Sequence, residues 1–178
     1  MDREALQSAL ERWDAARAEL AAFPYETLTT TERLAVVERR ERAHREDLAI
    51  DHTVLAAFAD DADPRVFGER SLRKVVALRL HLTENDAGSR LRDAAQLGPR
   101  RALTGEALTP ELEHTAAALA DGDIGAAHVA VIQRFLNSLP GWVDTTARAE
   151  AEQTLAQVAV GLDAEQLAKA ADHLYALI

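Results

Sequence analysis

Residues 71–97 read SLRKVVALRLHLTENDAGSRLRDAAQL, and this stretch decides how the chain is interpreted. Its apolar positions recur at helical spacing. They predict a helix from Ser71 to about Leu80, a short turn, and a second helix that begins after Thr83 and runs to about Gln96. The positions expected to face the interior are apolar or small: Leu72, Val75, Val76, Ala87, Leu91, Ala94 and Ala95. The segment therefore resembles a helix-turn-helix pair.

The residues on both sides of this pair also favour helix. Alanine supplies 37 of the 178 residues, whereas glycine supplies 8 and proline 5. A chain rich in Ala, Leu, Arg and Glu with few aromatic residues is typical of helical proteins. We therefore predict an all-α fold of about eight helices. The expected helices span about 2–22, 29–59, 71–80, 83–96, 109–122, 124–138, 144–160 and 163–178.

Local signals mark several helix ends. Residues 29–32 and 163–166 match capping boxes, in which the first and fourth side chains each bind the other residue's backbone N–H. Residues 109–110 read as an N-cap threonine followed by an N1 proline, and Gly122 reads as the glycine that ends the same helix. Residues 98–109 are expected to form a loop that precedes this helix.

Two regions are expected from the spacing of the helices. Residues 1–63 predict an N-terminal helical hairpin or arm, and residues 64–178 predict a helical bundle that contains the basic segment 71–96; one continuous domain is the alternative. The charged segment 38–47 is expected to be a solvated helix face with ion pairs four residues apart. The first helix carries an apolar stripe and the second carries inward-facing residues: Leu6, Leu10, Trp13, Ala16 and Leu20, then Leu34, Val37, Leu48 and Leu55.

The charge of the chain is strongly uneven. Its formal net charge of −10 argues against a nonspecific polyanion binder. Residues 65–101, however, hold nine basic and four acidic side chains. Because the Debye length is about 8 Å at physiological salt, this basic segment can act locally on a partner. The alternative is that acidic helices fold against the segment and neutralise it.

If the basic segment binds DNA, two kinds of side chain are available. One face of the second predicted helix carries groups that can bond base edges: Asn85, Ser89, Arg92 and Gln96. Nearby cations could hold phosphates: Arg70, Arg73, Lys74, Arg79, Arg90, Arg100 and Arg101. Glu84 and Asp86 lie on the same helix and oppose this interpretation, so ordinary packing of two helices stays open as the alternative.

The sequence contains no complete catalytic constellation. The absence of cysteine excludes disulfides, thiolate catalysis and Cys-based metal sites. Residues 41–44 and 111–114 match the Glu-x-x-His spacing of di-metal bundles, but chance matches are expected in a chain this rich in acids. His52 and His81 could titrate near neutrality, yet neither has a serine or other nucleophile at a sequence spacing that indicates a catalytic pair. We therefore expect no cofactor, no metal and no catalysis from this chain.

The chain also lacks targeting and membrane signals. Its first residues, MDREALQSALERWD, are acidic where a signal peptide needs a basic region and an apolar core. No apolar run approaches the roughly 20 residues that cross a bilayer. We therefore predict a cytoplasmic protein without a membrane segment.

Several motifs after residue 97 carry a family resemblance. They are Gly98-Pro99-Arg100-Arg101, then Ala120-Asp121-Gly122, Ile124-Gly125-Ala126-Ala127-His128-Val129, Leu139-Pro140 and Val143-Asp144. With these motifs the chain resembles the 13E12 repeat family of actinobacteria, the helical domain of unknown function 222. The resemblance implies a helical domain that commonly precedes an HNH-type nuclease domain and is linked to DNA metabolism or mobile elements. The resemblance assigns no active-site residue to this chain. Because the last helix keeps its apolar stripe to Ile178, we expect a longer protein.

Two functions follow as expectations. The first is a non-catalytic module that binds DNA or positions substrate for an HNH-type nuclease. The second is a protein–protein interaction module that dimerises through its N-terminal helices and makes no DNA contact. Trp13 and Trp142 are expected to be core or partner anchors, and an exposed Trp13 would favour an interface.

Overall fold

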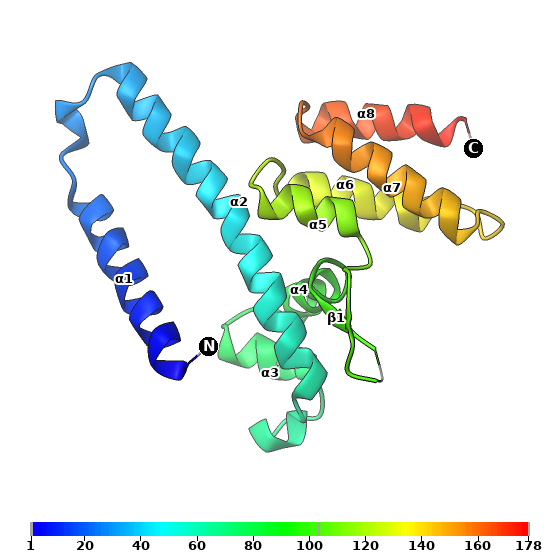
Figure 1. Ribbon diagram of the computed structural model, residues 1–178, viewed down its shortest axis with the longest axis horizontal. Coiled ribbons are helices and arrows are strands. Elements are labelled where there is room, and N and C mark those ends of the chain that lie inside the picture. The colour runs from blue at the N-terminus through cyan, green and yellow to red at the C-terminus, as the bar shows by residue number, and fades with distance from the viewer. Residues whose placement is uncertain (1, 103, 178) are drawn as a thin grey trace. The chain divides into compact units, whose positions relative to one another are not determined.

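The computed structural model describes residues 2–102 and 104–177 and confirms the all-α fold (Figure 1). Eight α-helices lie in this part of the chain, with two short 3₁₀ turns and two strands of two residues. The helices are α1 (Arg3–Ala22), α2 (Thr30–Asp61), α3 (Leu72–Arg79), α4 (Glu84–Leu97), α5 (Glu113–Ala120), α6 (Ala126–Ser138), α7 (Thr145–Ala159) and α8 (Ala164–Tyr175). The 3₁₀ turns are η1 (Tyr25–Thr27) and η2 (Pro64–Phe67), and the strands are β1 (Arg100–Arg101) and β2 (Ala107–Leu108).

The chain forms two compact units, unit 1 up to Arg40 and unit 2 from Glu41 on. The boundary lies inside α2, whereas the sequence pattern placed it after residue 63. The reason is that the second part of α2 belongs to the core of unit 2. Leu48 packs on one of the two apolar clusters of unit 2, and Leu55 and Phe58 pack on the other.

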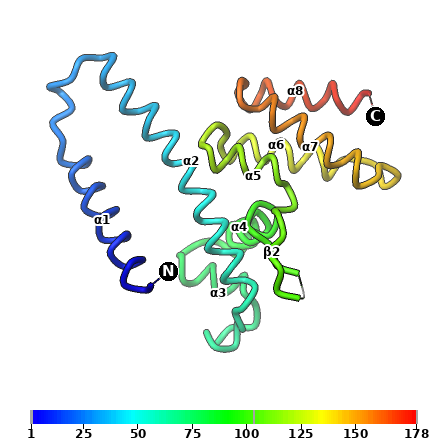
Figure 2. The backbone as a smooth tube through the Cα atoms, viewed as in Figure 1, coloured from blue at the N-terminus to red at the C-terminus, as the bar shows by residue number. Residues whose placement is uncertain are grey.

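Unit 1 consists of α1, η1 and the first turns of α2, which diverge from η1 (Figure 2). The turn is well connected: Arg33 donates from Nε to the carbonyl oxygen of Tyr25 at 2.9 Å, and the Tyr25 hydroxyl donates to the Leu20 carbonyl at 2.6 Å. None of residues 2–40 is buried, however. The expectation that Leu34 and Val37 face inward is therefore wrong, because unit 1 offers no second apolar layer against which they could pack.

The main core of unit 2 lies among α5, α6, α7 and α8. α6 packs on α7 and α8, α5 packs on α7, and α7 packs on α8. The side chains at the centre of this core are fully buried: Leu119, Ile124, Ile132, Leu155 and Leu167. A second, smaller cluster joins α3 and α4 through Val76, Ala77 and Ala87, with Leu55 and Phe58 of α2 against it. α2 therefore contributes to both clusters.

The predicted helix ends agree with the structure at four places. The Thr29 N–H donates to Glu32 Oε2 at 2.8 Å and the Glu32 N–H donates to the Thr29 hydroxyl at 3.3 Å, which completes one capping box. The Thr29 hydroxyl also donates to Glu32 Oε2 at 2.7 Å, and this bond together with that from the Thr29 N–H lowers the pKa of Glu32. The second box forms between Asp163 and Gln166. Asp144 caps α7, and Gly122 follows α5 in the left-handed conformation with φ 72°.

Residues 98–112 differ from the prediction. β1 and β2 pair antiparallel within the predicted loop, and Arg100 Nε donates to the Thr109 carbonyl at 2.9 Å. Thr109 therefore belongs to the hairpin and does not cap a helix. α5 begins four residues later, after Leu112, whose buried N–H donates to the Gln96 carbonyl at 3.0 Å. The N-cap prediction at residues 109–110 is wrong because these tertiary hydrogen bonds override the local signal.

A buried carboxylate supports the start of α5. Glu152 of α7 is only 4% exposed, and its Oε1 accepts from the Thr115 backbone N–H at 2.6 Å and from the Thr115 hydroxyl at 2.5 Å. The first backbone N–H groups of a helix lack partners within the helix, so this carboxylate satisfies one of them. The negative charge also lies at the positive end of the α5 dipole. Glu152 therefore connects α7 to α5 inside the core.

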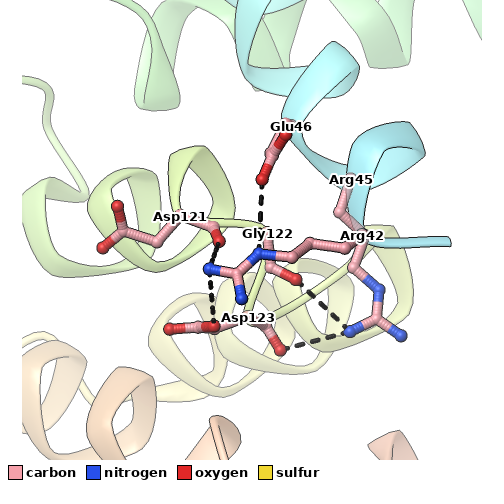
Figure 3. A network of polar contacts seen from close by, with 6 residues as sticks. All are labelled: Arg42, Arg45, Glu46, Asp121, Gly122 and Asp123. Carbon is pink, nitrogen blue, oxygen red and sulfur yellow. Dashed lines mark hydrogen bonds and ion pairs between the residues drawn. The ribbon is translucent and has the colours of Figure 1, made fainter. Parts of the chain in front are cut away.

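The segment 38–47 does more than form a solvated face. The predicted ion pairs are present, Arg42 with Glu46 at 3.3 Å and Arg45 with Glu41 at 3.0 Å. Both arginines also reach the turn between α5 and α6 (Figure 3). Arg42 Nη2 donates to the Asp121 carbonyl at 2.6 Å, and Arg45 Nη1 donates to the Asp123 carbonyl at 3.3 Å. We call this contact, between Arg42 and Arg45 of α2 and residues 121–123, the α2 clasp.

Gly122 makes the α2 clasp possible. Its positive φ of 72° disfavours any side chain. A Cβ atom at Gly122 would also lie 2.6 Å from Arg42 Cγ and 3.0 Å from the Arg42 carbonyl oxygen. The glycine therefore allows both the turn and the close approach of α2.

The Gly122→Ala substitution is expected to lower the free energy of unfolding by about 2–4 kcal/mol, since it combines a strained backbone with an overlap at α2. The matched control is Gly68→Ala, because Gly68 has a similar φ of 76° but no atom within 4 Å of its Cβ position. We expect the control to lose only about 1–2 kcal/mol. Urea unfolding followed by circular dichroism measures both. Equal losses for the two variants would mean that the α2 clasp does not restrict this position.

Candidate functional site

A polar groove runs between α4 and α6. Its volume is about 610 Å³. Side chains of the two helices form its walls: Ser89, Arg92, Asp93 and Gln96 of α4, and Ala130, Gln133, Arg134, Asn137 and Ser138 of α6. We call this feature the α4/α6 groove. Most of its lining residues carry hydrogen-bonding groups, so its chemistry suits a polar or charged ligand.

Gln133 organises the floor of the α4/α6 groove. Its Nε2 donates to Asp93 Oδ1 and to Gln96 Oε1, both at 2.9 Å. The Gln133 amide thus holds the side chains of Asp93 and Gln96 on the opposite helix in place. The Gln96 side chain keeps its two N–H donors for a ligand, whereas its oxygen is already bonded. The groove is therefore preorganised between two rigid helices.

Two arginines converge beside the α4/α6 groove. Arg73 of α3 and Arg92 of α4 both extend over Gly88, where a Cβ atom would lie 3.3 Å from Arg73 Nε and 3.6 Å from Arg92 Nη1. Glu84 only partly compensates this charge, since its carboxylate lies 3.9 Å from Arg73 and both side chains are about half exposed. Arg92 has no ion-pair partner among the described residues. Arg73 Nε also donates to the Glu84 carbonyl at 2.6 Å, so the remaining N–H groups of Arg73 and those of Arg92 form the local positive centre.

Further cations extend this positive surface. Arg134 of α6 is exposed and lines the α4/α6 groove opposite Arg92. An adjoining depression of about 430 Å³ shares Gln96, Gln133 and Asn137 with the groove. It adds Arg100, but Glu111 and Glu152 also line it. Arg148 also lines the depression, but its guanidinium donates to four backbone carbonyls near the end of α6 and serves the fold.

Three of the four residues predicted to contact bases lie together in the structure. Ser89, Arg92 and Gln96 line the α4/α6 groove, whereas Asn85 is exposed on the first turn of α4 and does not line it. This face of α4 therefore forms one wall of a groove and does not protrude into solvent. Ala95, which was expected to be buried, is exposed.

The predicted phosphate-binding cations fall into separate places. Arg73 lies beside the groove, Arg100 lines the adjoining depression, and Arg90 lines a different cavity between α2 and α4. The remaining cations are exposed on the α3 side or on β1: Arg70, Lys74, Arg79 and Arg101. Among the described residues, the ion pairs to cations of segment 65–101 are limited to that of Arg73 with Glu84. The other cations of this segment therefore have no carboxylate within ion-pair distance among the described residues.

The α6 wall was missed in the sequence. Gln133, Arg134 and Asn137 form the groove together with Ala130, at spacings of three, four and seven residues. A polar stripe of this kind could have been noted, but its proximity to α4 depends on the tertiary structure.

The cavity that Arg90 lines has a volume of about 370 Å³ and lies among α2, α4, α5 and α6. His52 Nδ1 is buried there without a hydrogen-bond partner among the described residues. Burial lowers the pKa of His52, although the charges of Asp93 and Asp51 act in the opposite direction. His44 and Arg90 also line this cavity. The neutral form of His52 is therefore favoured in the folded protein.

No cluster of three or more potential metal ligands occurs within residues 2–102 and 104–177. Of the two Glu-x-x-His matches, Glu41 instead pairs with Arg45, and Glu111 lies before the start of α5. In the same part of the chain, the helices are too short or too polar for a membrane span.

Comparison with known proteins identifies the family. The family model described as "Domain of unknown function (DUF222)" matches residues 34–178. The chain belongs to this family. The resemblance seen in the motifs after residue 97 is thereby confirmed for the helical domain. No solved structure matches the chain.

The relatives of this DUF222 chain include mycobacterial proteins. Uncharacterized protein Rv1128c of Mycobacterium tuberculosis (strain H37Rv) is 38% identical over 169 residues, which cover 95% of this chain and 37% of that protein. Uncharacterized protein Mb1179c of Mycobacterium bovis is 37% identical over 175 residues, which cover 98% of this chain and 37% of that protein. The chain thus spans about two fifths of the length of the curated relatives that it matches.

The low pKa of His52 predicts a pH dependence of stability. The unfolded chain binds a proton on this imidazole below about pH 6.5, whereas the folded protein does so only at lower pH. The stability contributed by neutral His52 is therefore present above about pH 6.5 and declines as the pH falls below it. Urea unfolding at pH 7.5 and pH 5.5 should show a larger loss for the wild type than for His52→Gln. The same loss in both would assign the pH dependence to other groups.

Proposed function

We propose that unit 2 is a non-catalytic DNA-binding module that holds the phosphate backbone at the α4/α6 groove. The convergence of Arg73 and Arg92 over Gly88 carries this proposal. A guanidinium group can bond two phosphate oxygens at once, so two neighbouring arginines can hold one phosphate or two successive ones. Arg134 on the opposite wall adds a third cation along the same path.

The groove also offers donors for bases. The free N–H groups of Gln96 and the exposed amide of Asn137 lie beyond the phosphate-binding cations. Amide side chains of this kind can bond adenine edges, while arginine favours guanine. In this proposal phosphate contacts supply most of the affinity and α4 and α6 together supply a modest sequence preference.

The acidic character of the rest of the chain shapes this binding. Residues 102–178 hold three basic and eleven acidic side chains, so DNA is repelled outside the basic segment. Charges farther apart than about 8 Å are largely screened at physiological salt, which leaves the local arginines effective. We therefore expect affinity that is restricted to one surface and falls steeply with salt.

The link to a nuclease is part of the proposal. The chain covers about two fifths of its relatives, and in the 13E12 resemblance a helical domain of this kind precedes an HNH-type nuclease domain. Unit 2 would then position DNA for chemistry performed elsewhere in a longer protein. A histidine- and asparagine-rich ββα segment encoded after Ile178 would support this role.

An interaction module without DNA contact is the second candidate. Trp142 is 71% exposed in the loop between α6 and α7, and large exposed aromatic side chains are typical anchors at protein interfaces. DNA titration separates the two candidates, since this module would bind no DNA at any salt concentration.

Arg73→Ala and Arg92→Ala are each expected to weaken binding of a labelled DNA duplex about tenfold at low salt. Loss of a phosphate contact should also reduce the slope of log affinity against log salt by about one. Fluorescence anisotropy over a salt series measures both quantities. The control is Lys169→Ala, which removes an exposed cation of α8 outside the groove and should change neither quantity. Binding that is undetectable, independent of salt or equally affected by the control would refute the proposal.

A further inference from the structure

Unit 1 presents an apolar surface that nothing in its own structure covers. Its large apolar side chains are between 42% and 60% exposed: Leu6, Leu10, Trp13, Leu20, Phe23, Leu34 and Val37. We propose that this surface is a homodimer interface and that a second copy of unit 1 covers it. The proposal is independent of DNA binding, since it concerns different residues and a different unit.

The spacing along α1 suits a helical partner. Leu6, Leu10, Trp13, position 17 and Leu20 follow one another at four, three, four and three residues. This alternation is the repeat of a seam between helices, in which each side chain inserts between side chains of the facing helix. Position 17 holds an arginine whose guanidinium lies 4.5 Å from the centre of the Trp13 ring, so its apolar stem can extend the seam.

Unit 1 needs a partner for physical reasons. None of its described residues is buried, so it has no core of its own. Helices in proteins gain most of their stability from packing an apolar face, which α1 does not do within unit 1. The hydrogen bonds of Arg33 and Tyr25 stabilise the turn but not the length of α1. An added apolar layer would supply the missing core.

The exposed area fits a dimer. The exposed parts of these seven side chains amount to at most roughly 700 Å² per protomer, against the ~800 Å² that each partner contributes to an interface of standard size. A two-fold axis places the same stripe on both protomers and so matches apolar area with apolar area.

The charge of unit 1 permits a second copy and disfavours strongly charged partners. Residues 1–40 hold six basic and eight acidic side chains, so two copies of this unit repel each other only weakly. The rest of the chain holds fourteen basic and twenty-two acidic side chains. A polyanion or a strongly basic protein would find no matching charge on unit 1. A copy of the same nearly neutral, amphipathic surface meets no such obstacle.

Sedimentation equilibrium of the full chain without DNA tests the proposal. The wild type is expected at twice 19.4 kDa at micromolar concentration. Leu10→Glu and Trp13→Glu should each shift the protein to 19.4 kDa, because a charge in the seam opposes association. The matched control is Leu78→Glu, which places the same charge at an exposed leucine of α3 in unit 2 and should leave the dimer intact. A monomeric wild type, or a dimer that persists in both seam variants, would overturn the proposal.

Tryptophan fluorescence provides a second readout that does not depend on the folding of a seam variant. In a Trp142→Phe background only Trp13 emits, and its emission should shift to longer wavelength as dilution separates the protomers. An emission maximum that does not change with concentration would show that Trp13 is always exposed or is covered by its own chain. Either result would overturn the dimer. Loss of DNA binding with the dimer intact would reject only the proposed function.

Discussion

The α2 clasp is the contact on which the arrangement of unit 2 depends. Arg42 and Arg45 bond the carbonyl groups of the α5–α6 turn, and Gly122 lets α2 approach that turn closely. The clasp fixes the long helix, which then contributes Leu48 to the main core and Leu55 and Phe58 to the α3–α4 cluster. Because one rigid helix enters both clusters, it also sets the relation of α4 to α6, and with it the groove.

The α4/α6 groove shows how a helical scaffold can gather charge that its composition disperses. The chain as a whole is acidic, yet Arg73 and Arg92 meet over a glycine and Arg134 faces them from α6. Gln133 holds the opposite wall through Asp93 and Gln96, so the groove is not left to flexible loops. Sites built on packed helices are positioned more precisely than sites on loops, which suits the proposed DNA-binding module.

The two units differ in their buried core and in the chemistry of their surfaces. Unit 2 has a core, buried polar contacts such as that of Glu152, and the basic surface. Unit 1 has an amphipathic surface and no core. Each unit thus lacks what the other has, and the proposed DNA-binding and dimer surfaces concern different residues. An interaction module and a DNA-binding module, posed as alternatives from the sequence, are compatible in this structure.

Short-range features were predictable from the sequence alone. The helical class, the capping boxes at residues 29–32 and 163–166, the glycine after α5 and the basic segment follow from residues no more than a few positions apart. The candidate site was predictable only in part: Ser89, Arg92 and Gln96 were assigned to one face, but Gln133, Arg134 and Asn137 were not.

Long-range contacts decided the rest. Arg42 and Asp121 are 79 positions apart, and no local pattern distinguishes an arginine that clasps a distant turn from one that is solvated. The same holds for Glu152, which caps α5 from 37 positions away. It also holds for Thr109, which is predicted to be an N-cap but whose carbonyl accepts a hydrogen bond from Arg100 in the hairpin. Helix formation depends on neighbours one turn away, so the sequence determined it. Which faces meet depends on packing and backbone hydrogen bonds between remote segments, and only the tertiary structure decided that.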